Sequence, residues 1–353
     1  MSYENGWAAL NLEMTKRVAM EEFDADRHWS LVSAVTGIRV DENSPPALQR
    51  QASTAFIKAW NYDLSLGACI HVQDLGSIRT DMGHGVYEQG GSDLTAIGEP
   101  FFKTVEQAMA FDPLESLPRL DKQALIRRFQ EARDGTLAYC GGDTVPTTGT
   151  YITLLTGFIY MFGWEMLLEV MGTDADRFGD QLNRYRQWMQ QYYDALAESD
   201  VQVIYSHDDI VWSAGAFCHP DFYRKYIFPN LKKLYEPVIA AGKKIIFLSD
   251  GDYTEFFDDL VATGAHGFFM EPYCDLALFA EKHGKNKVFI GNCDTRVLLK
   301  NDKAEIKAMV QRVMSIGKKH PGFIFGCTNM IPHNTPIDAA IYYHECYLAS
   351  CTR

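Results

Sequence analysis

Four apolar runs in the second half of the chain each end in a side chain that can bind a metal ion. These side chains are Asp250, Glu271, Cys293 and Cys327. Each run is rich in Phe, Ile or Val and is followed by Gly, Asp, Asn or Pro, which is typical of a buried parallel strand. Zinc accepts sulfur, nitrogen and oxygen ligands. The sequence therefore indicates a metal-dependent enzyme.

The spacing of these residues suggests which of them act together. A helix-sized segment separates Glu271 from Cys293, and another separates Cys293 from Cys327. Three neighbouring strands would then supply three ligands and leave open the fourth position that a catalytic zinc needs. Each residue also has a simpler interpretation: a lone cysteine often packs in a core, and Asp250 before a glycine suits an ordinary turn. Glu271 is harder to explain that way, because a buried carboxylate without a partner is costly.

A second group of polar residues ends the run 201–209. His207, Asp208 and Asp209 follow its apolar part directly. Histidine is a common zinc ligand and a general acid or base, and His207 and Asp208 are chosen as candidates for chemistry. The same residues would also suit the orientation of a substrate or the capping of the next helix. The pattern leaves these interpretations open.

The elements that must position these residues alternate regularly after Thr104. Helices are expected at 122–133, 177–197 and 220–241, and strands at 136–143 and 201–209 and at the four runs above, with a loop at 144–151. Strands that alternate with helices of this length indicate βαβ units. With a further strand candidate at 67–76, about seven strands favour a (β/α)8 TIM barrel, whose active site lies at the carboxyl ends of its strands.

The first third of the chain is less regular. Residues 2–23 are expected to be helical, and 49–60 again. We therefore predict an N-terminal helical extension, residues 1–65, packed on a catalytic barrel, residues 66–353. No glycine-rich dinucleotide motif follows a first strand, so a dinucleotide-binding fold has little support.

Composition limits the possible partners. The chain has 353 residues, 47% of them hydrophobic, and a formal net charge of −13. This acidity argues against nucleic acid and anionic membranes, and no apolar stretch reaches the roughly 18 residues of a membrane span. Eight scattered cysteines and no signal sequence suggest a reduced, cytoplasmic protein. The apolar stretch 148–168 could cover the pocket or form the face of a homodimer.

Three blocks of the C-terminal half resemble the uroporphyrinogen decarboxylase superfamily. They are DDIVWSAGAFCHPDFYRKYIFPNLKKL, LSDGDYTEFFDDLVATGAHGF and IFGCTNMIPHNTPID, and their order and spacing match over most of the chain after residue 130. The resemblance implies an (α/β)8 barrel. The superfamily contains decarboxylases that need no metal and cobamide-dependent methyltransferases that use zinc.

The motifs favour the methyltransferases. The Arg-rich segment of the decarboxylases is absent from the N-terminal region, and Cys327 stands at the cysteine of the methyltransferase Gly-Cys loop. Thiol-alkylating members also carry His-x-Cys where this chain has Leu248, Ser249 and Asp250. The resemblance therefore implies the demethylating branch, whose ligand set is a carboxylate and two cysteines.

We thus predict a zinc-dependent methyltransferase that moves a methyl group from a methoxylated, aromatic substrate to the cob(I)amide of a separate corrinoid protein, as in anaerobic O-demethylases. Glu271, Cys293 and Cys327 are the predicted zinc ligands; an exchange of roles between Asp250 and Glu271 stays open. The predicted catalytic residues are Asp250, His207 and Asp208. The alternatives are a decarboxylase without metal, and a barrel that binds a corrinoid or tetrapyrrole without catalysis.

Overall fold

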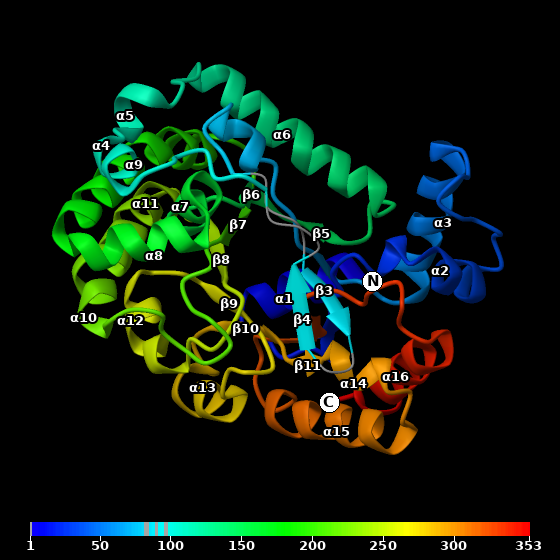
Figure 1. The fold of residues 1–353 in the computed structure, drawn as a ribbon. Helices are drawn as coiled ribbons and strands as arrows, with labels where there is room; N and C mark the ends of the chain where they lie inside the picture. The colour runs from blue at the N-terminus through cyan, green and yellow to red at the C-terminus, as the bar shows by residue number, and fades with distance from the viewer. Residues whose placement is uncertain (1, 81–84, 89–90, 95–97) are drawn as a thin grey trace.

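Parallel strands form the centre of the molecule. The computed structural model describes residues 2–80, 85–88, 91–94 and 98–353. Its main sheet has seven parallel strands with helices around them (Figure 1). In spatial order the strands are β1 (Ala19–Met20), β12 (Phe323–Phe325), β10 (Val288–Gly291), β9 (Gly267–Met270), β8 (Lys244–Leu248), β7 (Val203–His207) and β6 (Thr148–Thr150).

An eighth strand links the two edges of this sheet. β2 (Leu64–Ser65) pairs in parallel with β5 (Val145–Pro146), which leads into β6. Just before β2, Tyr62 forms a parallel bridge to Met20 of β1, and the Asp63 N–H donates to the Met20 carbonyl at 2.8 Å. Parallel neighbours therefore follow one another around the structure. This arrangement confirms the predicted TIM-barrel class of α/β fold.

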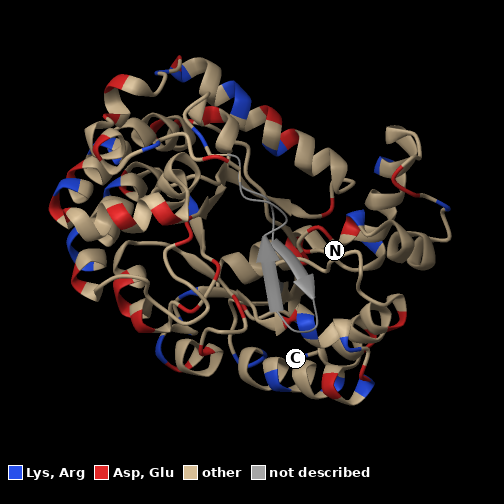
Figure 2. Ribbon diagram, viewed as in Figure 1, with Lys and Arg blue, Asp and Glu red and all other residues tan. Residues whose placement is uncertain are grey.

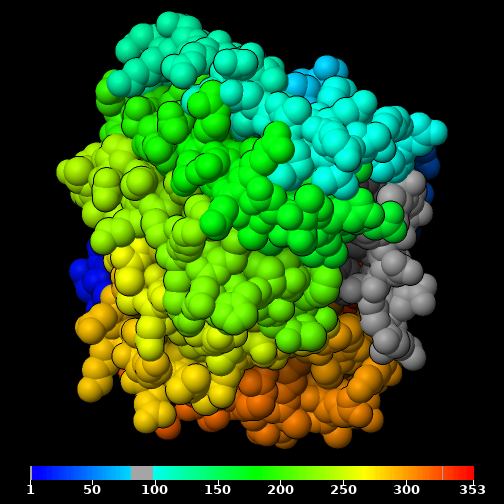
Figure 3. Space-filling model, turned by 60° about the vertical axis from the view of Figure 1, so that its left-hand side comes forward, coloured from blue at the N-terminus to red at the C-terminus, as the bar shows by residue number. Residues whose placement is uncertain are grey.

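Helices cover the outer side of the strands. Figure 3 shows successive segments of the chain stacked in order, from cyan at the top through green and yellow to orange below. Each crossover returns over the outside of the strands, as parallel pairing requires. The main helices are α1 (Ser2–Leu10), α2 (Trp29–Thr36), α3 (Pro46–Ala59), α6 (Lys122–Tyr139), α7 (Leu155–Phe162), α8 (Trp164–Thr173), α9 (Ala175–Glu198), α11 (Phe228–Ala240), α12 (Phe257–Ala262), α13 (Leu276–His283), α15 (Lys303–Gly317) and α16 (Ile337–Ser350).

Alternation along the strands divides the core into two layers. Successive side chains of a strand point to opposite faces. Tyr205, Leu248 and Phe269 belong to an inner cluster that the strands enclose. Phe247 and Phe268, each one residue before an inner residue, belong to the larger cluster between the strands and the helices. The same alternation decides which polar side chains can reach the barrel mouth.

The prediction of a strand at 136–143 is wrong. Residues up to Tyr139 continue α6, which buries Leu125 and Phe129 at helical spacing. Gly141 and Gly142 then take positive φ angles of 70° and 79°, which end the helix. The strand follows in the segment 144–151 that we expected to be a loop.

Threonines and one glycine build this strand. The hydroxyl of Thr150 lies 3.1 Å from that of Tyr193, so it has a hydrogen-bond partner inside the core. Gly149 approaches β7 so closely that a Cβ would lie 2.0 Å from the Tyr205 carbonyl oxygen. Polar β-branched residues suit a strand when their hydroxyls find partners.

The predicted helix at 2–23 is also too long. α1 ends at Leu10, and Ala19–Met20 pair with β12 as β1. The first 65 residues thus supply two barrel strands, β1 and β2, besides α1, α2 and α3. The division into a 1–65 extension and a 66–353 barrel stays a prediction.

Charged side chains lie mainly on the outer helices. In Figure 2, Lys and Arg alternate with Asp and Glu along these helices. Within the described ranges, no helix combines the length and the apolar character needed to cross a membrane.

Candidate active site

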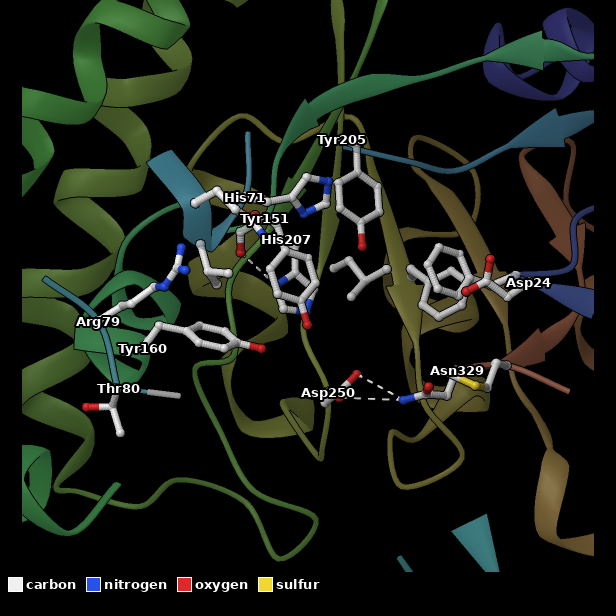
Figure 4. Close-up of a pocket in the computed structure, with 16 residues that line it drawn as sticks. Asp24, His71, Arg79, Thr80, Tyr151, Tyr160, Tyr205, His207, Asp250 and Asn329 are labelled. Carbon is white, nitrogen blue, oxygen red and sulfur yellow. Dashed lines mark hydrogen bonds between the residues drawn. The ribbon is translucent and has the colours of Figure 1, made fainter. Parts of the chain in front are cut away.

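A cavity of about 570 Å³ lies at the carboxyl ends of β7, β8 and β9 (Figure 4). Its walls combine aromatic rings with a small group of titratable side chains. The aromatic wall consists of Phe23, Tyr151, Tyr160, Tyr205 and Phe269, and the polar wall consists of Asp24, His71, Gln73, Arg79, Thr80, His207, Asp250 and Asn329. A barrel places its reactive groups at this face.

His207 is held in one orientation. It ends β7 and follows Tyr205 on the inner face of the strand. Its Nδ1 lies 3.0 Å from the Tyr151 carbonyl oxygen, and its ring stacks on the Tyr151 ring at 4.1 Å. With Nδ1–H donated to that carbonyl, Nε2 faces Asp209, whose Oδ1 is 3.2 Å away. A hydrogen bond from one ring nitrogen fixes the direction of the other, which can then bind a metal ion or accept a proton.

Asp209 and Asp250 lie beside this imidazole, and Glu271 is joined to Asp250 through Asn329. The Asp250 N–H donates to Asp209 Oδ1 at 3.1 Å. The Asn329 amide bridges the other two acids, donating to Asp250 Oδ1 at 3.4 Å and to Glu271 Oε1 at 3.2 Å. These contacts join residues from the ends of β7, β8, β9 and β13 into one polar group.

The turn after β8 needs its glycine. Gly251 has a φ of +88°, and a Cβ there would lie 2.5 Å from the Trp212 carbonyl oxygen. Its N–H donates to Glu271 Oε2 at 2.8 Å. The Asp-Gly pair therefore makes a turn, as its simpler interpretation suggested, and the turn itself positions Asp250 and Glu271.

Burial and neighbouring charges shift the pKa values of these four side chains in opposite directions. Burial lowers the pKa of His207, but Asp209 and Asp250 outweigh it and raise the value to about 9. Burial and the neighbouring Asp209 and Glu271 raise the pKa of Asp250 well above its usual range. Burial also raises the pKa of Glu271, whereas His207 overcomes burial and lowers that of Asp209. Opposed shifts of this kind are typical of sites that exchange protons or bind ions.

The same group is the candidate metal centre. The ligand atoms of His207, Asp209 and Asp250 all lie within 4.8 Å of one another. In the part of the chain that the structure describes, no other three His, Cys, Asp or Glu side chains come this close together. An imidazole with two carboxylates is a donor set that zinc accepts.

The two predicted cysteine ligands lie together, on the outer side of the strands. Cys293 and Cys327 are paired across β11 (Cys293–Asp294) and β13 (Cys327–Thr328). The Cys327 N–H donates to Glu22 Oε2 at 3.2 Å, and the Tyr343 hydroxyl donates to Glu22 Oε1 at 2.5 Å. Burial raises the pKa of both thiols well above the usual range. Both cysteines belong to the core between strands and helices.

The predicted ligand set is therefore spread over two places. Glu271 contacts Asn329 and Gly251 beside the cavity, while Cys293 and Cys327 lie near Glu22. The set Glu271, Cys293 and Cys327 stays a prediction.

Asp208 is buried away from the cavity. Its Oδ1 accepts the N–H groups of Leu154, at 3.0 Å, and Thr156, at 2.8 Å, where α7 begins. Burial raises its pKa to about 7. Its predicted catalytic role stays a prediction, and its contacts are those of a residue that positions α7.

Sequence reasoning passed over several residues of the site. Asp209 stands beside the chosen pair, and it follows Tyr205 and His207 with the two-residue period of an inner strand face. Asn329 follows a predicted strand directly, so strand-end position could also have found it. Tyr151 lies in the segment taken for a loop, and Arg79 gave no signal.

Comparisons with known proteins agree with this fold. Residues 61–346 match the family model described as uroporphyrinogen decarboxylase (URO-D). A curated uroporphyrinogen decarboxylase from Pelobacter propionicus is 24% identical over 177 residues, which are 50% of this chain and 50% of that protein; the match thus spans half the length of the relative. A solved structure, a methyltransferase from Methanosarcina mazei, aligns over 99% of this chain and 98% of its own, with a TM-score of 0.64 and 16% sequence identity. At this identity, the likeness shows a shared fold.

Proposed function

Because the chain belongs to the uroporphyrinogen decarboxylase family, we propose that it is a methyltransferase of the demethylating kind. Its methyl donor is a methoxylated aromatic compound that binds in the cavity. Its acceptor is the cob(I)amide of a separate corrinoid protein, which docks over the cavity mouth. The solved methyltransferase with the same fold supports this choice within the family.

The character of the cavity walls is the observation that carries the proposal. Tyr151, Tyr160 and Phe269 offer flat apolar faces for an aromatic ring. Among the described residues that line the cavity, Arg79 is the one Lys or Arg, against the carboxyl groups of Asp24 and Asp250. A single Arg offers few partners to a tetrapyrrole with many carboxylates, whereas an aryl methyl ether needs none.

The reaction requires the protein to exchange a proton with the ether oxygen and to hold the aromatic ring. The bond between the methyl carbon and the ether oxygen breaks, its electron pair stays on oxygen, and the methyl group forms a new bond to reduced cobalt. The oxygen then takes a proton and leaves as a phenol. His207 and Asp250 line the wall where this oxygen would lie, so they orient it and exchange its proton. The aromatic walls hold the ring and exclude water.

A bound zinc ion would polarise the ether oxygen as a Lewis acid. The zinc ligands predicted from sequence, Glu271, Cys293 and Cys327, stay a prediction, and the spectrum of the Co²⁺-substituted protein decides between them and the group His207, Asp209 and Asp250.

Methyl transfer to free cob(I)alamin tests the function directly. Purified protein is incubated without oxygen with cob(I)alamin and a panel of methoxylated benzenes and benzoates, and methylcobalamin and the phenol product are measured. We expect equal amounts of both products. His207→Gln should lower the rate by about 10² to 10⁴, while His219→Gln, at a side chain that is 78% exposed, should not. No methyl transfer from any compound, or equal rates in both variants, would contradict the proposal.

A decarboxylase is the second candidate, supported by the curated relative of that name. Arg79 and His71 lie on one part of the cavity wall and could pair with a substrate carboxylate (Figure 4). Carbon dioxide release from uroporphyrinogen by metal-free protein, with no corrinoid present, would establish this activity in place of methyl transfer.

A further inference from the structure

We propose that His207 Nε2, Asp209 and Asp250 bind a divalent transition-metal ion, zinc being the ion they fit best. The ligand atoms of the three side chains lie within 4.8 Å of one another. This set contains no sulfur and shares no residue with the set Glu271, Cys293 and Cys327. The role of the ion rests on the proposed function, but its binding does not.

The imidazole is oriented as a metal ligand should be. Nδ1 lies 3.0 Å from the Tyr151 carbonyl oxygen, and the ring stacks on Tyr151 with an angle of 6° between the planes. A histidine that donates one ring N–H to a carbonyl keeps the lone pair of its other nitrogen in a fixed direction. Here that nitrogen lies 3.2 Å from Asp209 Oδ1, with which it shares a proton that a bound metal ion would displace.

The balance of charge around the imidazole also indicates a cation. Asp209, Asp250 and Glu271 form one polar group, and none of the three is joined to a Lys or Arg in a described ion pair. Asp250 receives only the Asn329 amide, at 3.4 and 3.5 Å, in described side-chain hydrogen bonds. Neighbouring carboxylates repel one another, and a dication would neutralise two of them.

The position of the group suits a catalytic ion. His207 and Asp250 line the cavity, so an ion held by them keeps a side open to a substrate. Three protein ligands and one open position are the arrangement of catalytic zinc sites. The Asn329 amide, which donates to both Asp250 and Glu271, would hold Asp250 in place beside the ion. Cys293 and Cys327 lack this access because they are buried beside Glu22 and Tyr343.

Cobalt(II) substitution distinguishes the two ligand sets without any measurement of methyl transfer. Protein stripped with a chelator is titrated with Zn²⁺ and with Co²⁺, and stoichiometry, affinity and absorption are recorded. We expect one ion per chain, with ligand-field bands in the visible and no thiolate-to-cobalt charge-transfer band in the near ultraviolet. A strong charge-transfer band would overturn the proposal in favour of the cysteines, and so would the absence of stoichiometric binding.

Matched variants locate the ion. Asp209→Asn and His207→Gln should each weaken Zn²⁺ binding by more than about tenfold, since even residues behind the ligands contribute that much at zinc sites. The pair Cys293→Ser and Cys327→Ser should leave the affinity unchanged. Circular dichroism and melting temperature check that each variant folds, and the wild-type cobalt spectrum decides the question if one does not. Loss of binding in the serine variants alone would contradict the assignment.

The metal-binding experiments and the methyl-transfer assay test different claims. Metal bound by His207, Asp209 and Asp250 in a protein that transfers no methyl group would leave the site standing and remove the proposed activity. Methyl transfer by a protein whose Co²⁺ shows thiolate ligation would do the reverse.

Discussion

Asp250 takes part in opposed interactions. Its N–H donates to Asp209, while its carboxyl group lies near the carboxyl groups of Asp209 and Glu271. Burial and these neighbours raise its pKa well above the usual range. Like charges placed together lower the stability of the fold, and a residue with only a structural role would not need such an arrangement.

Asp250→Asn should therefore separate function from stability. We expect the methyl-transfer rate to fall by about 10² or more, and the melting temperature of the metal-free protein to stay the same or rise, because the repulsion between Asp250 and the carboxyl groups of Asp209 and Glu271 is removed. Thermal unfolding of chelator-treated protein measures the second effect.

The neighbouring Asp252 provides the control. Its Oδ1 accepts the Thr254 N–H at 2.9 Å, outside the cavity lining. Asp252→Asn keeps this acceptor oxygen, so it should keep the activity and change the stability by less than about 0.5 kcal/mol. A larger loss of stability in Asp250→Asn than in Asp252→Asn would show that Asp250 is a structural residue.

His344 makes the stability of the fold depend on pH. It lies in α16 and stacks on Trp60 at 4.7 Å, almost parallel. Burial lowers its pKa from 6.5 to about 4. The folded state thus holds His344 neutral between pH 6.5 and 4, where the unfolded chain takes up a proton. Its contribution is complete above pH 6.5 and is lost as the pH falls towards 4.

His344→Phe should remove this dependence and keep the stacking. Between pH 7 and pH 4, the unfolding free energy of the wild type should fall relative to that of the variant by about 3 kcal/mol, which is the free energy of the shift in pKa. Urea unfolding at several pH values measures the difference. The exposed His219 offers the control, and equal slopes for wild type and His344→Phe would show that His344 titrates normally.

At the scale of elements, β7 and α7 are joined by one carboxyl group. Asp208 follows β7, and its Oδ1 accepts the two N–H groups at which α7 begins. Helix starts leave such N–H groups without partners inside the helix. Since α7 carries Tyr160 to the cavity wall, this contact connects the barrel to the site.

Two variants of Asp208 test this connection. Asp208→Ala leaves both N–H groups buried without an acceptor, so we expect a loss of about 2 kcal/mol and a higher KM for the aromatic substrate. Asp208→Asn keeps an acceptor oxygen and should stay within about 1 kcal/mol of the wild type. Chemical denaturation and steady-state kinetics give the two quantities. If Asp208→Asn abolished turnover with stability intact, Asp208 would be a catalytic acid, as first predicted.

At the scale of the whole molecule, one ion pair ties the two ends of the chain to the ring of strands. Arg17 donates to both carboxyl oxygens of Asp63, at 2.6 and 2.8 Å, and to the Tyr347 hydroxyl at 2.7 Å. Asp63 also accepts the Met20 N–H at 2.8 Å, so it joins β1 to the start of β2. These contacts lie where the first strand meets the last helix.

Arg17→Ala should destabilise the entire fold. Asp63 is fully buried, and without its cation it becomes an unpaired charge, at a cost of about 3 kcal/mol. Arg17→Lys keeps the charge without the two-pronged contact and should lie between the wild type and the alanine variant. Urea unfolding measures the effect. Arg133→Ala, which breaks a pair with an exposed Asp134, should cost less than about 1 kcal/mol, and equal losses in both alanine variants would contradict the role of Asp63.

The sequence alone determined the class of the fold and the region of the site. Buried parallel strands have short apolar runs that end in turn residues, and these local patterns placed β7, β8, β9, β10 and β12 correctly. They also placed polar residues at strand ends, where a barrel opens. The same local reasoning missed β1 and β5, because those strands are short and are recognised only through their neighbours on distant parts of the chain.

Tertiary structure alone decided which strand-end residues belong together. A strand sends neighbouring residues to opposite faces, so His207 and Asp250 reach the cavity, whereas Cys293 and Cys327 pack outside with Glu22. Pairing across parallel strands then sets the distances between side chains far apart in sequence. The sequence supplied the candidate ligands, whereas their faces and distances depend on how the strands pair.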